Sequence, residues 1–135
     1  MGRTIGENIR NKVTINDQYS GDPLILYYRS PTAEERIAYR ASMYQREKDK
    51  VIFRLGEARQ EFGAKIVLGF EEGSFQIKEG DKLRVFSSEP ASANYDAGWK
   101  DLLKKYAADV LEALAEHAFE EARAIPSQED YTEKN

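Results

Sequence analysis

Side chains suited to metal binding or nucleophilic catalysis are scarce in this sequence. The chain has one histidine, His117, and no cysteine. A zinc site needs several nitrogen, sulfur or carboxylate ligands at short spacing, and no second histidine or cysteine stands near His117. A Ser-His-Asp triad would also depend on His117, and the Gly-x-Ser-x-Gly turn is absent. We therefore expect no metal site and no nucleophilic catalysis.

Four carboxylates are the remaining candidates for catalysis. Glu71, Glu72, Glu79 and Asp81 lie around a predicted turn. Two carboxyl groups can act as an acid and a base when a pocket brings them together. Acids that flank a turn are usually solvated, and the glycine patterns of nucleotide-binding loops are missing. We predict that the chain is not an enzyme and needs no cofactor, with a carboxylate enzyme as the alternative.

Length and charge limit the kinds of partner. The chain has 135 residues, which suits one domain, and a net charge of −4, which argues against general nucleic-acid binding. Residues 29–66 hold nine Lys/Arg against six Asp/Glu, and residues 100–135 hold five against nine. Two solvated helix faces explain this asymmetry. Head-to-tail docking between copies, or a nucleic-acid binder acting through residues 29–66, are the alternatives.

The length of the apolar runs and the composition of the first residues indicate where in the cell the protein is located. The apolar runs are a few residues long, far short of the ~20 needed to span a membrane. The first residues lack the apolar stretch of a signal peptide. We expect a cytoplasmic protein with no membrane partner.

Two hairpins are predicted. Val13 and Ile15 alternate with polar residues, residues 16–23 are turn formers, and residues 24–28 read as a second strand. Another hairpin is predicted over residues 75–86, with a glycine at its tip.

A helix should begin at Ser30-Pro31-Thr32-Ala33-Glu34-Glu35. Thr32 and Glu35 have the spacing of a capping box, and Ser30 with Pro31 at the first helical position is the competing register. Apolar residues then recur at spacings of three, four or seven as far as Ile66, interrupted only at Lys48. One long helix over residues 32–68 fits, and so do two helices broken near residues 46–50.

The last helix is predicted from Asp96 to Ala122, where a wide apolar face opposes a charged one. Residues 1–10 should be loose, and residues 123–135 should form a polar, disordered tail. The expected fold is α+β over residues 11–122. It has two β-hairpins packed on one long helix, continuous or broken, and on a C-terminal amphipathic helix.

Part of the apolar surface is expected to bind another protein. Most of the apolar face that carries Trp99 is expected to be core. Three apolar stripes and eight tyrosines in a small chain nevertheless leave room for some of this surface to be intermolecular. The candidate protein-binding residues lie on the two helical stripes and are Ile37, Tyr44, Val51, Leu55, Phe62, Trp99, Leu103 and Tyr106.

The order of these signals resembles the tail assembly chaperones of phages and prophages. The shared pattern is a short strand over residues 24–28, the Pro-Thr-x-Glu-Glu helix start at residues 31–35, and the Gly-aromatic-x-x-Gly turn at residues 69–73. A hairpin follows, and then an aspartate, Asp96, before the tryptophan Trp99 that opens the last helix.

This resemblance implies a mechanism. Such chaperones coat the long helical tape-measure protein until tail tube subunits arrive, which requires an apolar surface of moderate affinity repeated along the client. It implies a location in the cytoplasm of a bacterial host, a tape-measure or tube protein as partner, and self-association into a homo-oligomer. A structural tail or neck component, or an uncharacterised soluble protein-binding domain, is the alternative.

Overall fold

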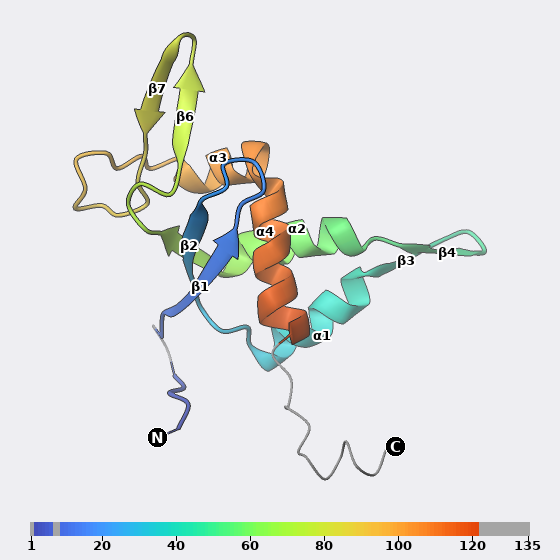
Figure 1. Ribbon diagram of the computed structural model, residues 1–135. Coiled ribbons are helices and arrows are strands. Elements are labelled where there is room, and N and C mark those ends of the chain that lie inside the picture. Colours follow the sequence, from blue (N-terminus) through green and yellow to red (C-terminus); the bar gives the residue numbers. More distant parts are fainter. Residues whose placement is uncertain (1, 7–8, 122–135) are drawn as a thin grey trace, which may run out of the picture.

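The computed structural model describes residues 2–6 and 9–121, and the chain folds as an α+β domain (Figure 1). The predicted tail over residues 123–135 lies outside the described residues. The strands are β1 (Asn11–Asn16), β2 (Pro23–Tyr28), β3 (Tyr44–Glu47), β4 (Lys50–Phe53), β5 (Val67–Phe70), β6 (Gln76–Glu79) and β7 (Lys82–Val85). The helices are α1 (Ala33–Ser42), α2 (Leu55–Ile66), α3 (Trp99–Tyr106), α4 (Ala108–Ala115) and a π-helical turn, η1 (Glu116–Glu121).

A three-stranded antiparallel sheet, in the order β1-β2-β5, forms the base of the domain. The predicted hairpin of β1 and β2 is confirmed, with Val13 opposite Leu26 and Ile15 opposite Leu24 on the face that meets the core. The sequence did not predict β5, because the expected helix covers the first residues of this strand. The chain instead turns directly from α2 into β5 at Val67, where the backbone becomes extended.

The main core lies between this sheet and the C-terminal helices. Leu26, Ile66, Leu103, Leu111 and Leu114 are fully buried in it. Burial of each such side chain contributes roughly 1.5–3 kcal/mol. This apolar contact, made by residues far apart in the sequence, defines the single α+β domain.

The prediction of one continuous C-terminal helix is wrong in one respect. Helical structure does cover residues 99–121, but it bends at Ala107, whose backbone leaves the helical region. Neither glycine nor proline stands at this position, so local propensity does not explain the bend. Tertiary packing does, because the bend lets Leu103 on α3 and Leu111 on α4 enter the same core.

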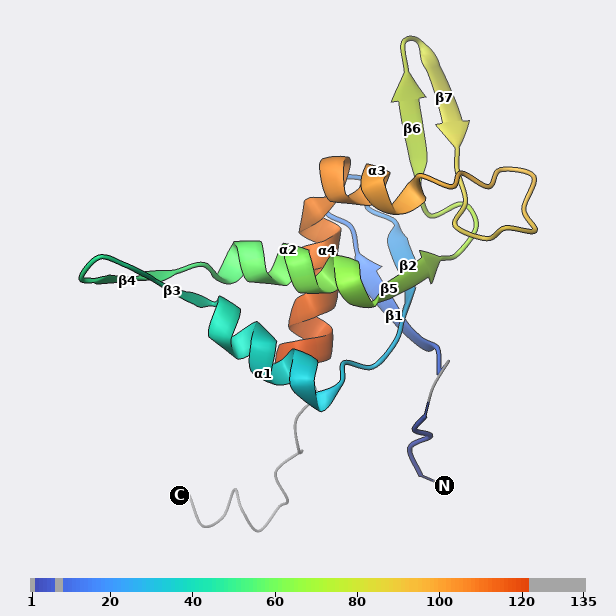
Figure 2. The same cartoon turned by 180° about the vertical axis from the view of Figure 1, so that it is seen from behind.

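The predicted helix over residues 32–68 is also corrected. Two helices, α1 and α2, replace it, and the segment between them is a β-hairpin of β3 and β4 (Figure 2). The break falls where the alternative prediction put it, near residues 46–50, but the flanking residues are strands and not helix ends. The capping box at Thr32 and Glu35, which begins this segment, is confirmed, with both hydrogen bonds present.

Helices α2 and α4 cross with their backbones in contact at Gly63. An added Cβ at Gly63 would lie 2.9 Å from the carbonyl carbon of Leu111, so only glycine fits. Gly56, one turn into the same helix, meets nothing nearer than the Glu112 carboxylate at 3.3 Å. The close approach of α4 to α2 therefore depends on glycine at position 63 and not at position 56.

No helix within the described residues has the length and apolar content to cross a bilayer.

We predict that Gly63→Ala destabilises the fold by about 1–3 kcal/mol, because overpacking must push the two backbones apart. Gly56→Ala is the matched control. Its neighbour is the mobile end of a side chain, and alanine favours the helix, so the free energy of unfolding should stay unchanged or rise by up to about 1 kcal/mol. Urea denaturation measures both variants. Equal stabilities of the two would contradict the backbone contact.

Candidate protein-interaction site

The β3–β4 hairpin projects from the domain as an arm, defined here as residues 44–53. In both views it extends away from the helices and the three-stranded sheet (Figures 1 and 2). Its tertiary contacts are made mainly with the end of α1. An isolated two-stranded hairpin is marginally stable in water, so an arm of this kind gains stability when a partner covers it.

One face of the arm is apolar. Tyr44 lies opposite Phe53, and Arg46 lies opposite Val51, so these four side chains share a face of the two-stranded ribbon. The rings of Tyr44 and Phe53 lie 5.4 Å apart, as a cross-strand pair. Tyr44, Val51 and Phe53 are 58%, 62% and 58% exposed, although each is large and apolar. Such a group on a projecting element is typical of a protein-binding surface.

The turn and the base of the arm are defined by the backbone. At the turn, Lys48 has a φ of 55°, a left-handed conformation that glycine or asparagine adopts more readily than lysine. At the base, the Arg54 N–H donates a 2.6 Å hydrogen bond to the Met43 carbonyl. The Arg54 guanidinium also pairs with Glu57, at 2.9 Å, and with Glu47, at 3.4 Å. Lys48 is the residue that interrupts the apolar spacing in the sequence, and it marks the turn.

Helix α1 positions the arm through a second, smaller core. Tyr39 stacks on Phe119 with ring centroids 4.5 Å apart, and Phe62 meets both rings edge-on. The Tyr39 hydroxyl donates a 2.5 Å hydrogen bond to Glu120, and Arg59 forms a two-pronged ion pair with the same carboxylate at 2.7 and 2.8 Å. Arg59 thereby lowers the pKa of Glu120, while burial raises the pKa of Tyr39. A charged carboxylate and a neutral phenol therefore join α1, α2 and η1.

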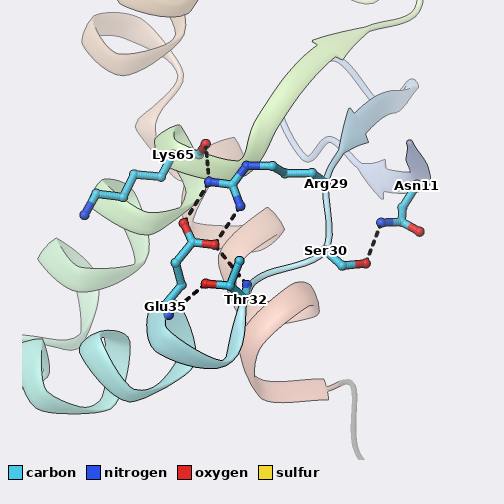
Figure 3. Close-up of polar contacts among 6 residues, drawn as sticks. All are labelled: Asn11, Arg29, Ser30, Thr32, Glu35 and Lys65. Atoms are coloured by element: carbon cyan, nitrogen blue, oxygen red, sulfur yellow. Dashed lines mark hydrogen bonds and ion pairs between the residues drawn. The ribbon is translucent and has the colours of Figure 1, made fainter. Parts of the chain in front are cut away.

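A polar cluster holds the start of α1 against β2 and α2 (Figure 3). The Arg29 guanidinium donates two hydrogen bonds to Glu35, at 2.6 and 2.7 Å, and a longer one to the Lys65 carbonyl. Glu35 also accepts from the Thr32 N–H, and the Thr32 hydroxyl accepts from the Glu35 N–H. The hydrogen bonds from Arg29 lower the pKa of Glu35 to about 2. The capping box predicted from sequence therefore also ties the helix to the sheet.

The structure separates the eight predicted protein-binding residues into two groups. Four are exposed: Ile37 on α1, Tyr44 and Val51 on the arm, and Tyr106 at the end of α3. The other four belong to the two cores or pack on them: Leu55, Phe62, Trp99 and Leu103. Because α1 and α2 are separate helices, the predicted stripe from Ile37 to Ile66 is not one surface.

Sequence reasoning missed Phe53 as an exposed apolar residue. The run Val51-Ile52-Phe53 is rich in β-branched and aromatic residues and follows a polar turn, which is a strand signal. The seven-residue spacing of the apolar positions outweighed this signal. Read as a strand, the run places Val51 and Phe53 on the same face.

The four carboxylates considered for catalysis lie exposed around the β6–β7 hairpin. Glu72 accepts hydrogen bonds from Ser92 and Asn94, and these bonds lower its pKa. Glu79 pairs with Arg84 on the neighbouring strand at 2.5 Å. These two acids therefore serve the local structure of the turn.

His117 lies beside Glu121, with its Nδ1 3.2 Å from the carboxylate, and edge-on to the ring of Tyr28. Within the described part of the chain, no three His, Asp or Glu side chains come together as metal ligands would.

Comparisons with protein families, curated proteins and solved structures found no match to this chain.

We predict that acid weakens the link between α1 and the sheet. The pKa of Glu35 is about 2 in the fold and near 4.5 in the unfolded chain, so the pair contributes stability above about pH 4.5 that is lost as the pH falls toward 2. Glu35→Gln removes this contribution but keeps a capping oxygen. Its melting temperature should fall less than that of the wild type between about pH 5 and pH 2.

Glu34→Gln is the control for this measurement. It removes the same charge one residue away and leaves the bonds to Arg29 intact. Its acid dependence should follow the wild type. Identical pH profiles for Glu35→Gln and the wild type would contradict the role given to the pair.

Proposed function

We propose that this chain is a protein-binding assembly factor of a phage-like tail, similar in role to the tail assembly chaperones, and that it engages a partner through the arm. The observation that carries the proposal is the exposed apolar face of Tyr44, Val51 and Phe53 on a hairpin that projects from the domain. The order of sequence signals supports the tail assembly context. The expected client is a helical tape-measure protein or a tail tube protein.

The arm suits a partner that must later be released. An interface of standard size uses about 20–30 residues on each side, and the arm is much smaller. One arm alone therefore gives modest affinity, and several copies along a long client give tight capture through avidity. Displacement by incoming tube subunits then requires only the loss of weak individual contacts.

A persistent structural component of the tail or neck is the second candidate function. The β6–β7 hairpin also projects from the domain and exposes Leu83 and Val85, so the chain presents two extensions that suit contacts with neighbouring subunits (Figure 1).

Capture of a client tests the proposal. Tagged wild-type protein, expressed in its native host under prophage-inducing conditions, should recover one very long helical protein or a tube subunit, identified by mass spectrometry. Val51→Lys should reduce this recovery about tenfold or more, because burial of a valine contributes ~1.5–3 kcal/mol to binding. The position is exposed, so the variant should fold.

Leu83→Lys is the matched control, since Leu83 is 65% exposed on β7 and undergoes the same chemical change. It should capture as much client as the wild type. Full capture by Val51→Lys would remove the arm from the proposal, and loss of capture by both variants would favour the structural component.

Mass spectrometry of purified mature particles separates the two functions. An assembly factor should be absent from finished tails, whereas a structural component should be present in a fixed ratio to the tube protein. Stoichiometric presence would overturn the chaperone role.

A further inference from the structure

A cleft lies where α3 turns into α4. One end holds about 360 Å³ and is mostly apolar. Phe75, Ile77, Leu102 and Tyr106 line it, and Gln76 and Lys78 are the polar residues at its edge. Its continuation, of about 350 Å³, shares Phe75 and Tyr106 with the first part and runs between the β1–β2 loop and the start of α4. The floor of the cleft therefore presents apolar side chains from two helices and a hairpin.

The far end of the cleft is acidic. Asp17, Tyr19 and Asp109 line it. The Asp17 carboxylate is occupied, because it accepts hydrogen bonds from the Ser20 N–H and hydroxyl. Asp109 is exposed and has no ion-pair partner among the residues that the structure describes. The cleft thus changes from an apolar end to an end with an available negative charge.

The arm has the complementary pattern. Its apolar face begins with the pair Tyr44 and Phe53 and continues toward the tip with the pair Val51 and Arg46. Two residues along a strand span about 7 Å, so an aromatic anchor and a positive charge follow each other at that spacing. Arg46, like Asp109, makes no ion pair within the described part of the chain.

The arm cannot fill the cleft of its own chain. In both views it extends away from α3 and from the β6–β7 hairpin, the elements that border the apolar end of the cleft (Figures 1 and 2). An arm that docks in this cleft must therefore come from another molecule, and every further copy of this chain carries such a projecting segment of matching chemistry.

We infer that the arm of one copy docks in the α3–α4 cleft of the next, with Tyr44 and Phe53 against the apolar end and Arg46 beside Asp109. This inference rests on the proposed function and names the immediate partner of the arm. The contact is heterologous, so repeated copies form a ring or an open chain. The same face of the arm binds either the next copy or the client, so a client must displace the docked arms in order to be captured.

Light scattering after size-exclusion chromatography, over a series of concentrations, tests the inference with purified full-length protein. The wild type should form oligomers that dissociate on dilution. Phe53→Lys removes the arm anchor, and Tyr106→Lys blocks the cleft at a residue that is 66% exposed. Each variant should raise the dissociation constant at least tenfold and elute as a monomer. Leu68→Lys is the control: Leu68 is 44% exposed on β5 and does not line the cleft, so this variant should assemble as the wild type does.

Mixing the two monomeric variants tests the direction of the contact. Phe53→Lys keeps a working cleft and Tyr106→Lys keeps a working arm, so an equimolar mixture should form a dimer and nothing larger. Arm-to-arm pairing predicts instead that Tyr106→Lys assembles normally. That result, or a mixture that stays monomeric, would overturn the inference.

A charge exchange provides a second test that does not depend on the apolar anchors. Arg46→Glu and Asp109→Lys should each weaken assembly, and the double variant should restore it, because the new carboxylate on the arm of one copy would meet the new ammonium group in the cleft of the next. Circular dichroism confirms that each variant is folded. A double variant as weak as the single ones would place Arg46 and Asp109 in different contacts and overturn the inference.

The outcomes for client capture and for assembly are independent. A wild type that stays monomeric at every concentration, while Val51→Lys still loses the client, would leave the proposed function standing and end the inference. Assembly that depends on the arm, without capture of any tail protein, would support the inference and end the proposed function.

Discussion

The crossing of α2 over α4 at Gly63 fixes the positions of most other elements. The two backbones are in direct contact at this point, so no side chain lies between the helices that could repack and let them slide. The end of α2 then leads directly into β5 of the sheet, and the end of α4 continues into η1, which carries Phe119 and Glu120 to α1. The direction in which the arm leaves the domain follows from this crossing, because its strands join α1 to α2.

Sequence patterns predicted the elements whose signals are local. The first hairpin, the β6–β7 hairpin and the capping box at Thr32 each depend on turn formers, alternation or a side chain three residues away, and each is present. β5 was missed because it has only four residues and follows α2 without a break, so its first residues fell within the helix predicted over residues 32–68. The bend at Ala107 has no local signal, since two helix faces share one core only in three dimensions.

The arm shows why periodicity alone can mislead. Ile37, Tyr44 and Val51 are seven residues apart, which suits a helix, yet a hairpin with its turn at Lys48 also brings Tyr44 and Val51 to one face. The turn residue is a lysine in a left-handed conformation, so the usual glycine or asparagine signal was missing. The sequence also could not distinguish exposed Tyr44 from buried Phe62, because that distinction depends on tertiary contacts. Which of the eight candidate residues are exposed was therefore visible only in the fold.

The backbone bond between Arg54 and Met43 closes the arm where it leaves the helices, and the two cores lie entirely outside it. Substitutions within residues 44–53 are thus insulated from the packing constraints that govern the rest of the chain. An arm of different length or composition can therefore evolve between the same two helix ends. Recognition can then diversify between related proteins while the scaffold stays the same.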